Sequence, residues 1–187
     1  MPHMPPVPTR RATLALLSAA TLGACASAPL PSIGPDGRPL PRAYRIDRAE
    51  ARRVPFRALD AVNALRASSG VPAVELDRQL TAAAATHARD MSLQNRPWLF
   101  GSDGSSPIDR AIRAGFDGRL LGETISESFE TELETIVAWS QEPASRRILL
   151  DPEARLMGFA FFQEDNGKLW WVLNMGGAPT GGFPTLV

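Results

Sequence analysis

Hydrophobic residues recur at helical spacing in four stretches of the chain. The first predicted helix covers residues 56–69, and Gly70 follows where a helix commonly ends. The second begins after Asp77, a favourable N-cap, and reaches about residue 94. Shorter helices are predicted over residues 107–114 and 131–140. The apolar positions that define the two long helices are Leu59, Val62 and Leu65, then Leu80, Ala84, His87 and Met91.

Alternating positions predict three strands. Residues 155–163 and 168–174 flank the dipeptide Asn166-Gly167, a strong hairpin signal, and residues 119–126 form another extended segment. Both faces of the hairpin strands are apolar, so both faces of the sheet must be covered. The pattern therefore predicts an α+β fold: a three-layer α-β-α sandwich in which a small antiparallel sheet is flanked by about four helices.

The remaining segments of the folded part are expected to be irregular. Pro72 prevents a helix in residues 71–76, which are predicted to be an extended connector. Residues 95–106 are rich in Gly, Ser and Asp and are predicted to form a loop. Residues 143–153 are bounded by prolines and are also predicted to be irregular.

The N-terminus has the pattern of an export signal. Arg10 and Arg11 precede a short apolar run, residues 12–22, which is too short to span a bilayer as a helix. The arginine pair favours a twin-arginine route only weakly, and the general export route is the prediction. Cys25, the single cysteine, follows this run as in bacterial lipoprotein signals, so residues 1–24 are predicted to be removed and Cys25 to be lipidated. The alternative for Cys25 is a buried free thiol.

A linker is predicted between the lipid and the folded domain. Residues 25–45 are rich in proline and glycine, and the domain is predicted to occupy residues 46–187. Two or more acyl chains give stable membrane anchoring. By similarity to Gram-negative lipoproteins, Ala26 after the cysteine favours the outer membrane. The predicted location is therefore the cell envelope, lipid-anchored in the outer membrane and facing the periplasm.

Composition excludes several partners and cofactors. The chain has 20 basic and 20 acidic residues, and without Arg10 and Arg11 there are 18 basic residues against 20 acidic ones. No basic stripe is present, which argues against nucleic acid. The chain has two histidines, and His3 belongs to the predicted leader. A domain with His87 alone and a lipidated cysteine cannot build a His₂ or cysteine-rich zinc site, so no metal and no cofactor are predicted.

A series of short motifs runs along residues 56–176. They are Asn63-Ala64-Leu65-Arg66, Leu76-Asp77, His87-Ala88, Gly101 to Pro107 with Arg110, Gly115-Phe116, Gly122-Glu123-Thr124-Ile125, Trp139 with Glu142, Gly158, and Trp170-Trp171. None of them is specific alone, but their order and spacing together resemble the CAP superfamily of cysteine-rich secretory, antigen and pathogenesis-related proteins. The resemblance implies the same α-β-α sandwich.

The resemblance also implies a central cleft, and here the chain departs from the family. Members with a metal centre carry two histidines and two glutamates in that cleft. The matching histidine positions are Leu99, within one residue, and Ser145, while Glu123 and Glu142 match the glutamates. The cleft is therefore expected to contain Leu99, Glu123, Glu142 and Ser145 without a transition metal. Two carboxylates alone would hold at most a weakly bound hard cation.

Two polar groups admit both a structural and a chemical interpretation. His87 lies on an apolar helix stripe and is expected to be a core histidine with one hydrogen bond. The sharper alternative makes it a general base for Ser145 or Glu123. Glu123 and Glu142 could be a carboxylate pair of the kind a glycosidase uses. The favoured interpretation is a leftover cleft carboxylate that hydrogen-bonds backbone amides.

Three functional hypotheses follow. The first is a non-catalytic module of the envelope, anchored through the lipid on Cys25, that binds a lipid, glycan or protein ligand; the family's sterol and fatty-acid binders suggest the lipid. The second is a hydrolase of cell-wall glycan or peptide that uses Glu123 and Glu142. The third is an α+β lipoprotein outside this family, which a wide separation of those glutamates would favour.

Overall fold

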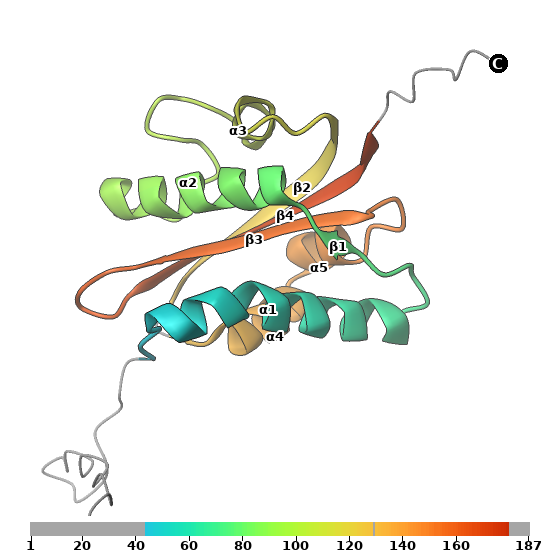
Figure 1. The fold of residues 1–187 in the computed structure, drawn as a ribbon, viewed down its shortest axis with the longest axis horizontal. Helices are drawn as coiled ribbons and strands as arrows, with labels where there is room; N and C mark the ends of the chain where they lie inside the picture. The colour runs from blue at the N-terminus through green and yellow to red at the C-terminus, as the bar shows by residue number, and fades with distance from the viewer. Residues whose placement is uncertain (1–43, 129, 180–187) are drawn as a thin grey trace, which may run out of the picture. The chain divides into compact units, whose positions relative to one another are not determined.

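A four-stranded sheet forms the middle of the domain, with strand order β1-β3-β4-β2 (Figure 1). The computed structural model describes residues 44–128 and 130–179, so the predicted signal, Cys25 and most of the predicted linker lie outside the described residues. The elements are α1 (Arg48–Ser68), β1 (Glu75–Leu76), α2 (Arg78–Gln94), α3 (Pro107–Arg113), β2 (Gly118–Ser128), α4 (Glu132–Gln141), α5 (Pro143–Leu149), β3 (Leu156–Gln163) and β4 (Leu169–Pro179).

Helices cover both faces of this sheet, which confirms the predicted α-β-α sandwich. In Figure 1, α2 and α3 lie on one side of the strands, and α1, α4 and α5 lie on the other. β3 and β4 form the predicted antiparallel hairpin, and β2 pairs antiparallel with β4. One expectation was incomplete, because β1 pairs with β3 in parallel and the sheet is therefore mixed.

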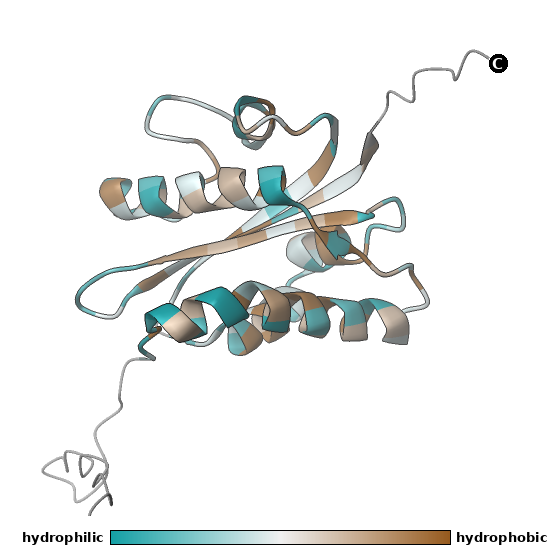
Figure 2. Cartoon of the chain, viewed as in Figure 1, coloured by the Kyte–Doolittle hydropathy of each residue, from teal (hydrophilic) through white to brown (hydrophobic). Residues whose placement is uncertain are grey.

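Two apolar layers hold the sandwich together, one on each face of the sheet. Hydrophobic residues follow β3 through its middle (Figure 2). On the α1 side, Met157, Phe159 and Trp171 are fully buried and pack with Val62. On the α2 side, Trp170 and Val172 are buried against Ala84, Ala88 and Met91. The strands are apolar on both faces, as the sequence predicted, because neither face meets water.

The first helix starts earlier than predicted. It begins at Arg48, and Asp47 caps it by accepting hydrogen bonds from the backbone amides of Ala49 and Glu50 at 2.7 and 2.8 Å. Pro55 lies inside this helix, where proline is normally unfavourable. Val54 next to it is fully buried, so tertiary packing holds the first two turns against the local preference.

The segment expected to be irregular contains a fifth helix. α5 has Pro143 at its first position, where the missing amide hydrogen is not needed, and Glu142 is its N-cap. Pro143 was expected to bound an irregular segment, but it begins a helix. The domain also reaches Tyr44, whose hydroxyl donates to Glu132 at 3.2 Å, just before the predicted start at residue 46.

A buried arginine ties α1 to the loop that precedes β3. The Arg66 side chain is fully buried and donates to the carbonyls of Pro72, Leu149 and Asp151 at 2.7, 2.6 and 3.0 Å. The guanidinium serves all three carbonyls at once, and the Asp151 carbonyl also accepts from the Ala154 amide at 3.1 Å. Among the helices described, none is long and apolar enough to cross a membrane.

Candidate functional site

Glu123 lies on β2 and points toward the layer formed by α2 and α3. Its neighbours on the strand point the other way: the Thr124 hydroxyl is 2.7 Å from the Ser145 hydroxyl of α5, and a Cβ on Gly122 would touch Ile148 of α5. Successive side chains of a strand alternate between its two faces. Glu123 is therefore directed into the interior on the α2 side, where its side chain is 1% exposed.

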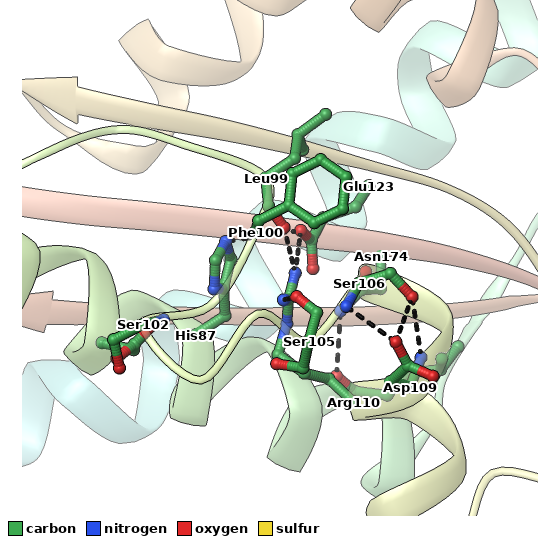
Figure 3. A network of polar contacts seen from close by, with 12 residues as sticks. His87, Leu99, Phe100, Ser102, Ser105, Ser106, Asp109, Arg110, Glu123 and Asn174 are labelled. Carbon is green, nitrogen blue, oxygen red and sulfur yellow. Dashed lines mark hydrogen bonds and ion pairs between the residues drawn. The ribbon is translucent and has the colours of Figure 1, made fainter.

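Arg110 of α3 is the direct partner of Glu123. Its Nη2 donates to Glu123 Oε1 at 2.7 Å and to the Leu99 carbonyl at 2.8 Å, and its Nη1 donates to the Ser105 carbonyl at 2.8 Å. The buried guanidinium thus joins the loop 95–106 to β2 (Figure 3). Sequence analysis named Arg110 only within the family-like motifs; the signal for its role was its place one turn into a helix opened by Ser106-Pro107.

His87 of α2 completes this group. It is fully buried, and its Nε2 is 3.6 Å from Glu123 Oε1, beyond ordinary hydrogen-bond distance. No hydroxyl nucleophile is hydrogen-bonded to its ring within the described part of the chain. The expectation of a core histidine agrees with this burial, but the expected hydrogen bond is missing, and the geometry gives no support to a general base for Ser145.

Burial controls the ionisation of both groups. Loss of hydration raises the pKa of Glu123 to about 7, although the neighbouring Arg110 charge acts to lower it. Burial, reinforced by the Arg110 charge, lowers the pKa of His87 to about 4. At neutral pH the imidazole is therefore neutral, and the Glu123 carboxyl is present in both protonation states.

Asn174 of β4 is the cross-strand neighbour of Glu123. Within the described residues, Asn174 Oδ1 and Glu123 Oε2 are both buried without a hydrogen-bond partner. The Asn174 side chain acts to lower the pKa of Glu123, as Arg110 does, so burial alone raises it.

Glu142 does not join Glu123. It caps α5, where its carboxylate accepts from the backbone amides of Ala144 and Ser145 at 2.9 and 2.5 Å. These bonds lower its pKa, and the residue is exposed to solvent. Glu142 belongs to the α5 layer, across the sheet from the Glu123 side chain. The alternative of a carboxylate pair is thus not supported, while the favoured expectation that a glutamate hydrogen-bonds backbone amides describes Glu142 and not Glu123.

The two positions matched to the family's histidines also lie apart. Leu99 contributes its carbonyl to Arg110, and its side chain is 40% exposed. Ser145 is on the other layer, bonded to Thr124. In residues 44–128 and 130–179, no group of three or more His, Cys, Asp or Glu side chains is placed to hold a metal ion.

Comparison with known proteins matches residues 59–175 to the cysteine-rich secretory protein family, CAP. The uncharacterized protein YkwD of Bacillus subtilis is 24% identical over 114 residues, which cover 61% of this chain and 44% of that protein. The chain thus spans less than half of this relative's length.

Two solved structures share the fold at 17% sequence identity and a TM-score of 0.62. One is an extracellular protein containing an SCP domain from Bacillus anthracis, where the match covers 71% of this chain and 44% of that one. The other is an outer surface protein of Borrelia burgdorferi, where it covers 73% and 98%. The relatives therefore include extracellular and surface proteins.

Proposed function

Because the chain belongs to the cysteine-rich secretory protein (CAP) family, we propose that it is a membrane-anchored extracytoplasmic module that binds an envelope ligand without catalysis. The ligand would be a lipid, a glycan or a protein. The placement of Glu123 and Glu142 on opposite faces of the sheet does not favour a fold outside the family, since the match over residues 59–175 stands without that pair.

The separation of the two glutamates carries this proposal. A glycosidase of the usual kind needs two carboxyl groups on either side of one bond. Glu123 is buried and bonded to Arg110 on one side of the sheet, and Glu142 caps α5 on the other. Each carboxyl group stabilises a different part of the fold. The two therefore do not form a shared reaction centre.

Anchoring rests on the sequence alone. The apolar run before Cys25 and the proline-rich residues 26–45 support a lipidated N-terminus and a tether. Outer-membrane retention follows from Ala26 in a Gram-negative cell. The extracellular and surface relatives agree with export, and the lipid and the membrane remain part of the proposal.

A hydrolase is the second candidate, and one observation favours it. The raised pKa of Glu123 is what a general acid requires at neutral pH. A substrate would have to reach a side chain that is 1% exposed, however, and this requires the loop 95–106 to move away from Arg110. The proposal of a binding module is preferred because burial accounts for that pKa without a reaction.

Native mass spectrometry of the chain purified from its own envelope tests the proposal. A retained lipid, glycan or protein adduct, together with acyl chains on Cys25, is the expected result. Cys25→Ser should lose the acyl mass and the membrane attachment while keeping the ligand. A product-sized fragment that accumulates only when Glu123 is intact would overturn the non-catalytic assignment.

A further inference from the structure

Two neighbouring recesses open around the loop between α2 and α3, and Arg110, the partner of Glu123, lines one of them. One is a pocket of about 370 Å³ between α2 and α3, and its lining includes Asp90, Asp103 and Arg113. The other is an open groove of about 480 Å³ beside Trp98 and Phe100. Ser102 lines both, so the polar and the aromatic recess adjoin each other.

The aromatic recess presents apolar rings to solvent. Trp98 and Phe100 are 42% and 44% exposed, and their ring centroids are 5.6 Å apart in an edge-to-face arrangement. The guanidinium of Arg96 stacks over Trp98 at 4.0 Å from the ring centroid. Exposed neighbouring aromatic groups on an otherwise polar loop are characteristic of a recognition surface.

The polar recess contains charges that are already paired. Arg113 donates to Asp103 at 2.5 Å, while Asp90 accepts from the Ser102 amide at 2.8 Å and from Gln94 at 2.8 Å. Neither sign of charge is left in excess, so the recess does not select an ion. The Ser102 hydroxyl already donates to Asp90, so the carboxylates and hydroxyls of the recess offer a ligand their remaining acceptor positions, which suit a neutral ligand rich in hydroxyl groups.

The loop that carries these groups is rigid. The Gly101 amide donates to the Ser105 carbonyl at 2.8 Å, and Gly104 has a positive φ of 78°. A Cβ at Gly101 would come within 2.6 Å of the Ser105 hydroxyl oxygen. Arg110 holds the same loop from beneath through two of its carbonyls. The exposed rings are therefore held in place before a ligand arrives, which reduces the entropy lost on binding.

We propose that these two recesses form a binding site for an oligosaccharide. One sugar would lay its apolar C–H face on the side of the Trp98 ring that Arg96 does not cover, with its edge against Phe100, and the next would direct hydroxyls to Ser102 and Asp103. A lipid tail would need an enclosed apolar cavity, whereas both recesses open to solvent. The inference rests on the proposed binding function and specifies its ligand class.

Trp98 provides a built-in reporter for the test. Of the chain's four tryptophans, Trp98 is 42% exposed, while Trp139, Trp170 and Trp171 are between 0% and 5% exposed. Titration of the purified protein with N-acetylglucosamine oligomers, and with soluble peptidoglycan fragments, is expected to shift the emission saturably and to protect it from acrylamide. Isothermal calorimetry then compares Trp98→Ala, Trp98→Phe and Phe56→Ala.

Trp98→Ala should weaken binding about tenfold, since it removes one aromatic platform, and Trp98→Phe should restore most of the affinity. Phe56→Ala is the matched control, because Phe56 is 61% exposed on α1 in the opposite layer, and it should bind like the parent.

Absence of saturable binding, or equal losses in Trp98→Ala and Phe56→Ala, would overturn the site. An emission shift with phospholipid vesicles in place of sugars would assign the rings to a bilayer instead. Cleavage of a bound oligomer would overturn the non-catalytic function and leave the site standing, whereas membrane retention without sugar binding would overturn the site alone.

Discussion

Two substitutions in the buried cluster should change the free energy of unfolding with opposite pH dependence. Glu123→Gln removes a carboxyl whose pKa is raised from 4.5 to about 7 in the fold. His87→Gln removes an imidazole whose pKa is lowered from 6.5 to about 4. Arg110 and Asp90 are the other charged groups around the cluster, and both variants retain them.

The sign follows from which state binds protons more tightly. The folded state holds the Glu123 proton more firmly than the unfolded chain does, so its contribution is complete below pH 4.5 and is lost as pH rises toward 7. Folding opposes protonation of His87, so its contribution is complete above pH 6.5 and is lost as pH falls toward 4. One pKa unit corresponds to about 1.4 kcal/mol, so each contribution changes by roughly 3 kcal/mol over its range.

Urea unfolding followed by tryptophan fluorescence at pH 4.5, 5.5 and 6.5 measures these changes. The parent should lose its advantage over Glu123→Gln as pH rises, and should gain advantage over His87→Gln across the same values. Subtraction of the parent at each pH removes the contributions of the exposed acids. An advantage over Glu123→Gln that grows with pH would refute the reasoning, because it would mean that the Arg110 ion pair outweighs burial.

Four further substitutions test the packing of the fold and the lipid anchor. Gly158→Ala should prevent stable folding, because a Cβ there would overlap the Leu80 backbone of α2. A Cβ at Gly70 would meet no atom within 4 Å, so Gly70→Ala should lower the free energy of unfolding by only about 1–2 kcal/mol, because of its positive φ. Thermal melts compare the two variants. Arg66→Met should destabilise by roughly 3–5 kcal/mol in urea unfolding, because it leaves buried carbonyls without donors, and a loss below 1 kcal/mol would contradict that role. Cys25→Ser should move the protein from the membrane fraction to the soluble periplasm in cell fractionation, and continued sedimentation with membranes would exclude the lipid anchor.

Periodicity was sufficient for the layers of the fold. The two-faced apolar strands required cover on both sides, and the buried stripe of Leu80, Ala84 and Met91 was visible in the sequence because helix spacing is regular. The turn at Asn166-Gly167 was also predictable, because it depends on two adjacent residues. The start of α1 was not predictable in this way, since burial of Val54 holds the helix through Pro55 and that burial is a tertiary effect.

The candidate site was less accessible from sequence. The alternation of β2 already implied that Glu123 and Thr124 face opposite ways, yet which layer each one meets depends on long-range packing. The Arg110 to Leu99 hydrogen bond joins residues from a helix and a loop, and no periodic pattern encodes it. Glu142 looked like a cleft residue, although its position before Pro143 was also the mark of a helix cap.

The central claim is that the domain binds an envelope ligand without cleaving it. Incubation of the purified protein with insoluble peptidoglycan, with bound protein and released reducing ends and free amines measured together, tests this most directly. The account predicts saturable retention on the polymer and no release above a protein-free control, for the parent and for Glu123→Gln alike. Release of reducing ends or amines that Glu123→Gln abolishes would contradict it and identify Glu123 as a catalytic acid.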